Sequence, residues 1–154
     1  MTTSTPSTFA APILVVEDSD EDFDTLREAA AAAGVTRVIH RSASGGDCLA
    51  MLRGEGEVHL ELLPALIVMD LNSHGVDGRE ALVVIKTDVR LKGIPVVVLT
   101  TSGNPKDVVF CYQAGANAYH VKPVRYDQYS SLLRSLMHYW LESVTLHACL
   151  AKVD

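Results

Sequence analysis

Short runs of hydrophobic and β-branched residues recur along the chain, separated by longer stretches in which apolar and polar positions mix. The runs span residues 13–16, 36–40, 64–69, 94–100 and 118–121. In the run at 64–69 almost every position is apolar, which is typical of a parallel strand covered on both faces. The pattern therefore predicts buried strands at these places.

The stretches between the strands show the 3.6-residue periodicity of helices. Ser44 and Pro105 are typical helix starts, Gly34 and Gly115 are typical helix ends, and a last helix runs from about 125 to 144. Strands that alternate with helices of this length predict a βα repeat. We therefore expect an α/β fold, with a doubly wound five-stranded parallel sheet and helices on both faces.

The chain of 154 residues is long enough for one domain with a single sizeable core. Residues 1–11 are rich in Ser, Thr and Pro and predict a flexible N-terminal tail. We place the domain at 12–146 and a C-terminal tail at 147–154.

Composition excludes several classes of function. The net charge is −6 and no basic stripe is present, which argues against nucleic-acid binding. No apolar run is long enough to span a membrane, and the N-terminus lacks a signal sequence. The three cysteines have no disulfide or zinc spacing, which favours reduced thiols and a cytoplasmic location.

Four of the predicted strands end in residues that carry specific chemistry. These strand ends are Glu17-Asp18, Asp70, Thr100 and Lys122. The carboxyl ends of parallel strands meet at one edge of a doubly wound sheet, so these residues converge on one site. The alternative is that each one is a separate helix cap or a solvated charge, but the coincidence of four strand ends favours a shared site.

Such a site suits phosphoryl chemistry. Three carboxylates repel one another and require a countercharge, and their hard oxygens are the ligands that Mg²⁺ prefers. Lys122 and Thr100 are suited to holding a phosphoryl oxygen, and Asp70 is suited to becoming an aspartyl phosphate.

Four motifs resemble the receiver domain of two-component response regulators. They are ILVVEDSDED, LIVMDLN with the Asp-Gly pair at 77–78, PVVVLTTS, and YHVKP at 119–123, and the resemblance covers about 13–140. It implies a flavodoxin-like fold with strand order 2-1-3-4-5. It also implies the following roles: Asp70 as phosphoacceptor, Glu17, Asp18, Asp70 and the Asn72 backbone carbonyl as Mg²⁺ ligands, Thr100 and Tyr119 as switch residues, and Lys122 as the partner of the phosphoryl group.

Within this family the chain is similar to stand-alone receivers paired with bacterial and cyanobacterial phytochromes. The resemblance implies a sensor histidine kinase as partner, with a phytochrome as the candidate, and a signalling role rather than an enzymatic one. An aspartyl-phosphate phosphatase is the second hypothesis, but it needs an acid at the position of Asn72. A phosphorylation-silent pseudo-receiver is the third, but such modules lack part of the acid, acceptor and Lys set that is present here.

One position departs from the family pattern. The loop after Asp70 has His74 where the family usually has Pro. Loss of a proline restores backbone freedom, so we expect an effect on loop rigidity and phosphorylation rate but not on the chemistry.

The last predicted helix carries more apolar residues than one stripe against the sheet requires. We expect its surplus to form a homodimer interface, since aromatic anchors are enriched at interfaces. The interface residues are Leu136, Tyr139, Trp140 and Val144. Because no effector domain follows in this sequence, we expect output through a partner or through self-association.

Overall fold

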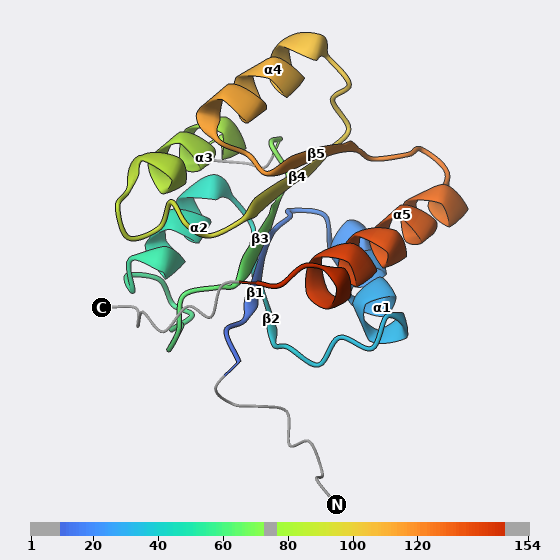
Figure 1. Ribbon diagram of the computed structural model, residues 1–154, viewed down its shortest axis with the longest axis horizontal. Helices are drawn as coiled ribbons and strands as arrows, with labels where there is room; N and C mark the ends of the chain where they lie inside the picture. Colours follow the sequence, from blue (N-terminus) through green and yellow to red (C-terminus); the bar gives the residue numbers. More distant parts are fainter. Residues whose placement is uncertain (1–9, 73–76, 147–154) are drawn as a thin grey trace, which may run out of the picture.

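Strands and helices alternate along the chain, as the sequence pattern predicts (Figure 1). The computed structural model describes residues 10–72 and 77–146. Its elements are β1 (Ile13–Val16), α1 (Asp20–Ala32), β2 (Ile39–Ser42), α2 (Gly45–Leu52), β3 (Leu66–Met69), α3 (Gly78–Thr87), β4 (Val96–Thr100), α4 (Pro105–Ala114), β5 (Ala118–Val121) and α5 (Tyr126–His138), followed by a π-helical turn, η1 (Tyr139–Ser143).

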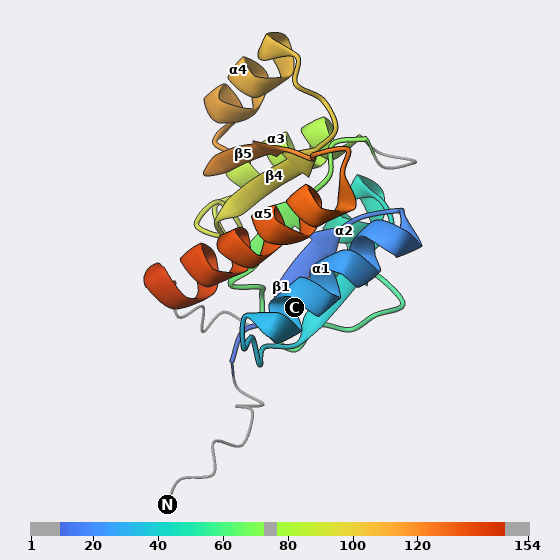
Figure 2. The ribbon, with the colours of Figure 1, turned by 90° about the vertical axis from the view of Figure 1, so that its right-hand side faces the viewer.

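The five strands form one sheet in the order β2-β1-β3-β4-β5, and every pair is parallel. Helices α1 and α5 cover one face of the sheet, and α2, α3 and α4 cover the other (Figures 1 and 2). The predicted doubly wound fold and its strand order are therefore confirmed.

The central strands β1 and β3 owe their place to apolar side chains on both faces. Leu14 and Val16 pack in the core beneath α2 and α3, whereas Ile13 and Val15 pack in the core beneath α1 and α5. Burial on both faces fixes the register of β1 against β3, because a shift by one residue exchanges the two sets of side chains. The residues that follow these two strands are thereby held side by side, and the Asp70 N–H donates to the carbonyl of Val16 at 3.0 Å.

The bounds of three strands differ from the prediction. Strand β2 spans Ile39–Ser42 and not 36–40, because Ile39 pairs with Ile13 at the start of β1. Strands β3 and β4 begin two residues later than predicted, at Leu66 and Val96. The last helix also differs, since α5 ends at His138 and continues as the π-helical turn η1.

The predicted tails lie mostly outside the described residues, which begin at residue 10 and end at residue 146. Ala11, which we assigned to the N-terminal tail, is buried, and its carbonyl accepts a hydrogen bond of 2.8 Å from Arg37. Across the described ranges, no helix is both long and apolar enough to traverse a lipid bilayer.

Candidate functional site

The carboxyl edge of the sheet brings together the residues at the ends of β1, β3, β4 and β5. Glu17, Asp70, Thr100 and Lys122 are all buried there. The Lys122 Nζ lies 2.5 Å from Glu17 Oε1 and 3.0 Å from Asp70 Oδ2. Separate parts of the sequence therefore meet at one site. The ammonium group of Lys122, which follows β5, lies between the acids that follow β1 and β3.

Burial and ion pairing act against each other at this site. Burial favours the neutral form of Lys122, but the hydrogen bond and charge of Glu17, with Asp22 and Asp70, raise its pKa above the ordinary value. Burial also raises the pKa of Glu17, although Lys122 offsets part of that rise. Lys122 is therefore a fixed positive charge whose main partners are carboxylates.

Glu17, Asp18 and Asp70 each place one carboxylate oxygen within 4.8 Å of the oxygens of the other two. This set of hard oxygen donors fits a divalent cation such as Mg²⁺, which binds through a few carboxylates and keeps several waters. Asp18 is only half-buried, which leaves room for such waters. Asn72 donates its N–H to Asp70 Oδ1 at 3.0 Å, and the role of its carbonyl oxygen as a ligand stays a prediction.

Asp22 also belongs to the site, although it was not among the predicted site residues. Its Oδ2 lies 2.9 Å from the Lys122 Nζ, and its N–H is capped by the Ser19 hydroxyl. The available signal is that Asp22 belongs to the same acidic stretch, 17–22, as Glu17 and Asp18. Acids are common in the first turn of a helix, so this signal does not identify a site by itself.

The two predicted switch residues are linked through Ser102. Thr100 Oγ1 accepts hydrogen bonds from Asn72 Nδ2 at 3.1 Å and from the Ser102 N–H at 3.4 Å. The Tyr119 hydroxyl donates to the Ser102 carbonyl at 2.7 Å. Ser102 is thus the residue that connects them.

The predicted interface residues differ in exposure. Leu136 lies in the core, where it is 4% exposed, so its side chain serves mainly to hold α5 on the sheet. Tyr139 is 56% exposed, and its ring meets that of Trp140 edge to face, with centroids 5.6 Å apart. Trp140 and Val144 are half-buried. His74 and its neighbours at 73–76 lie outside the described residues.

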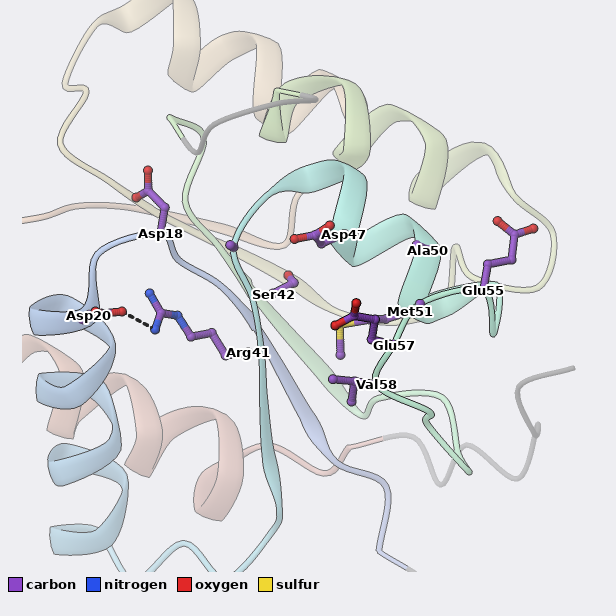
Figure 3. Close-up of a pocket in the computed structure, with 12 residues that line it drawn as sticks. Asp18, Asp20, Arg41, Ser42, Asp47, Ala50, Met51, Glu55, Glu57 and Val58 are labelled. Atoms are coloured by element: carbon purple, nitrogen blue, oxygen red, sulfur yellow. Dashed lines mark hydrogen bonds and ion pairs between the residues drawn. The ribbon is translucent and has the colours of Figure 1, made fainter.

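A cavity of about 680 Å³ adjoins the site on the side of β2 and α2 (Figure 3). Its lining includes Asp18, Asp47, Glu55 and Glu57, whereas Asp70 is not part of it. Arg41, the cation among the described lining residues, bonds the Asp20 carboxylate at 2.6 Å and the Glu17 carbonyl at 2.8 Å.

Comparison with known proteins agrees with this geometry. The family model of the response regulator receiver domain matches residues 13–134, and the chain belongs to that family. Response regulator Rcp1 of Synechocystis sp. is 38% identical over 136 residues, covering 88% of this chain and 92% of Rcp1.

Two solved structures are similar over nearly the whole domain. The phosphorylated cyanobacterial phytochrome response regulator RcpA has a TM-score of 0.83 at 37% identity, covering 89% of this chain and 98% of that one. The Mn²⁺-bound form of Rcp1 has a TM-score of 0.84 at 36% identity, covering 89% and 99%. The likeness therefore extends to proteins whose structures hold a phosphoryl group or a divalent cation.

Proposed function

We propose that this protein is a single-domain response regulator that accepts a phosphoryl group on Asp70 in a Mg²⁺-dependent reaction. The observation that carries the proposal is the position of Lys122, whose Nζ lies 3.0 Å from Asp70 Oδ2 beside the acids Glu17 and Asp18. This arrangement supplies a nucleophilic carboxylate, a cation for the incoming phosphoryl oxygens and a set of metal ligands.

The transfer would proceed from a phosphohistidine of a sensor kinase. A bond forms between phosphorus and an Asp70 carboxylate oxygen as the phosphorus–nitrogen bond breaks, and the imidazole leaves with the electron pair and takes up a proton. Lys122 holds a phosphoryl oxygen, and the Thr100 hydroxyl donates to another. Glu17, Asp18, Asp70 and the Asn72 carbonyl would hold Mg²⁺, which neutralises charge in the loose transition state.

The signal would pass from Asp70 to a protein-interaction or dimer surface. A phosphoryl group that recruits Thr100 biases an equilibrium that already exists in the free protein. Tyr119 is linked to Thr100 through Ser102, so it is placed to respond to that change. The exposed face around Tyr139 and Trp140 is the proposed surface for homodimer formation.

The proposed partner is a sensor histidine kinase, and a phytochrome is the favoured one. Support comes from the phytochrome response regulator RcpA, which is 37% identical. Cys48 and Cys111 are free thiols, which is typical of cytosolic proteins and supports a cytoplasmic location.

Two alternatives are weaker. An aspartyl-phosphate phosphatase requires a general acid two residues after the nucleophile, where this chain has Asn72, whose amide is not acidic enough to transfer a proton to a leaving group. A phosphorylation-silent pseudo-receiver needs no buried lysine on the acceptor, yet Lys122 remains there at the cost of its burial. We therefore favour a signalling protein over an enzyme or an inert module.

The test is intact mass spectrometry after incubation with acetyl phosphate, with and without Mg²⁺. One phosphoryl adduct is expected on the native chain and none on Asp70→Asn. Asp47→Asn, an exposed acid on α2, is the matched control and is expected to be phosphorylated normally.

Beryllofluoride, a phosphoryl analogue, separates the remaining outcomes. An adduct that forms without Mg²⁺, or that persists in Asp70→Asn, contradicts the proposal. Binding of neither acetyl phosphate nor beryllofluoride would show that the site is silent and would favour the pseudo-receiver.

A further inference from the structure

A chain of polar contacts from Ser102 to the start of α3 has no part in the proposed transfer. The Ser102 hydroxyl donates to Asp107 Oδ2 at 2.5 Å. The other oxygen of that carboxylate, Oδ1, accepts from Arg79 Nε at 3.1 Å and lies 2.9 Å from Arg79 Nη2. Arg79 Nη1 in turn lies 3.0 Å from Asp77 Oδ2. One guanidinium therefore joins the first turn of α4 to the start of α3.

The start of α3 is itself fixed against the phosphoacceptor. A Cβ at Gly78 would lie 2.6 Å from the Asp70 carbonyl oxygen and 2.8 Å from Leu71 Cα, so only glycine permits this approach. Gly78 thus lies against the backbone of Asp70, and its neighbour Arg79 pairs with Asp107.

The contacts close into a ring. From Asp70 they run through Asn72 to Thr100, from Thr100 to Ser102, and from Ser102 through Asp107 to Arg79. The backbone then leads from Arg79 to Gly78, which lies against the Asp70 backbone. Tyr119 joins this ring at one point, where its hydroxyl meets the Ser102 carbonyl. The position of that carbonyl is therefore set from two directions, by Thr100 on the site side and by Asp107 on the Arg79 side.

We propose that Arg79 is a positioning residue that couples the phosphoacceptor site to Tyr119, by holding the Ser102 carbonyl through Asp107 where the Tyr119 hydroxyl reaches it. The inference rests on the proposed function, because it names a regulatory element of the same site. Arg79 suits the role because its planar guanidinium binds both Asp77 and Asp107 in a fixed geometry, which a lysine cannot reproduce.

The Arg79–Asp107 ion pair is less exposed to solvent than an ordinary surface ion pair. The Arg79 and Asp107 side chains are 28% and 21% exposed, whereas those of the Arg27–Asp24 pair on α1 are 61% and 58% exposed. The Ser102 and Arg79 hydrogen bonds also hold the pKa of Asp107 below its ordinary value, so this carboxylate stays charged at neutral pH. Arg79→Gln removes the charge while keeping a side chain that favours a helix.

The experiment uses the full chain labelled with 3-fluorotyrosine, in which the ¹⁹F signal of Tyr119 is assigned from a Tyr119→Phe variant. The first measurement is made without Mg²⁺ or any phosphoryl donor, so it does not depend on the proposed function. We expect Arg79→Gln and Asp107→Asn to move the Tyr119 signal towards that of a solvent-exposed ring. In Arg79→Lys we expect the Tyr119 signal to lie between its positions in the native chain and in Arg79→Gln. The matched control Arg27→Gln should leave the signal unchanged.

The second measurement is the concentration of beryllofluoride, with Mg²⁺, that half-saturates the protein. Coupling between the site and Tyr119 predicts that Tyr119→Phe shifts this midpoint by roughly fivefold in the native chain but by less than about twofold in Arg79→Gln. Thermal unfolding of each variant separates this effect from a loss of folding.

Two results would overturn the inference. One is a Tyr119 signal that is the same in Arg79→Gln as in the native chain. The other is an equal effect of Tyr119→Phe with and without Arg79. If neither the native chain nor any variant binds beryllofluoride, the proposed function is wrong. The ¹⁹F measurement without Mg²⁺ still decides the role of Arg79 in that case.

Discussion

At the scale of single residues, Lys122 determines whether the acids of the site coexist. Its side chain is 4% exposed and lies within 3.0 Å of oxygens from Glu17, Asp22 and Asp70. Each of these carboxylates would be costly to hold near the others without a countercharge. The lysine is therefore a structural cation in the metal-free protein as well as the proposed partner of the phosphoryl group.

Replacing Lys122 with Met should destabilise the metal-free protein by about 3–5 kcal/mol, because it leaves buried carboxylates without their cation. Mg²⁺ should restore part of this loss, since it supplies positive charge to the same oxygens. Urea unfolding with and without Mg²⁺ measures both effects, and Lys106→Met, at an exposed lysine, is the control. If Lys122→Met and Lys106→Met have the same free energy of unfolding without Mg²⁺, this role of Lys122 is contradicted.

The sequence identified the site residues that directly follow strands. It did not identify the residues on helices that contact them in the folded protein. Glu17, Asp70, Thr100 and Lys122 share one signal, because each ends an apolar run, and the fold then brings them together. Asp22 and Arg79 carry no such signal. They lie on helices at positions where charged residues are usual, and only the three-dimensional packing shows what they contact.

At the scale of elements, Gly78 sets how closely α3 approaches the end of β3. An added Cβ meets backbone atoms of Asp70 and Leu71, which cannot move aside as a flexible side chain would. We expect Gly78→Ala to lower the free energy of unfolding by about 1–3 kcal/mol, as overpacking does, and to slow phosphorylation of Asp70.

Gly93→Ala is the matched control, because a Cβ there meets nothing within 4 Å. Urea unfolding and the acetyl phosphate reaction are measured on both variants. If Gly78→Ala is as stable and as reactive as Gly93→Ala, the close approach of α3 has no consequence for the site.

Helix α2 buries the Cys48 thiol in the core, and this predicts a pH dependence. Burial raises the pKa of Cys48 from 9.0 to about 12. Above pH 9 the unfolded chain therefore loses a proton that the folded chain retains, and stability falls as pH rises, by at most about 1.4 kcal/mol per pH unit from this group.

Urea unfolding at pH 7.5 and pH 10, under reducing conditions, tests the contribution of Cys48. Cys48→Ala leaves a small cavity and lowers stability at both values, so the quantity to compare is the change between them. We expect a smaller change in Cys48→Ala than in the native chain. The same change in both would assign the alkaline loss to other groups.

Strand β2 shows where a local pattern fails. The sequence pattern predicted this strand at 36–40, and the polar residues Arg41 and Ser42 were not part of it. In the structure these polar residues belong to the strand, since pairing with β1 determines its bounds. Arg41 then reaches the Glu17 carbonyl, a contact that local sequence cannot reveal.

At the scale of the whole molecule, the site and the proposed dimer surface lie in different places. The site occupies the carboxyl edge of the sheet, whereas Tyr139 and Trp140 follow α5 at its far end (Figures 1 and 2). A cavity of about 400 Å³ opens there, lined by His120, Leu132, Ser135, Leu136, Tyr139 and Trp140. Since this surface is apolar and carries two adjacent aromatic rings, it has the features of a self-association site.

Trp140→Ala should weaken self-association by about 2 kcal/mol, or roughly 30-fold in the dissociation constant, as expected for a central aromatic residue of an interface. Phosphorylation of Asp70 should not be abolished, because Trp140 lies after the end of α5 and supplies none of the proposed site residues. Sedimentation equilibrium at micromolar concentration measures the dissociation constant. Tyr126→Ala, which removes an exposed ring at the opposite end of α5, is the comparison. A lower mass for Tyr126→Ala but not for Trp140→Ala would show that the interface lies at the start of α5. If the native chain is a monomer, the signal must instead pass to a different partner protein.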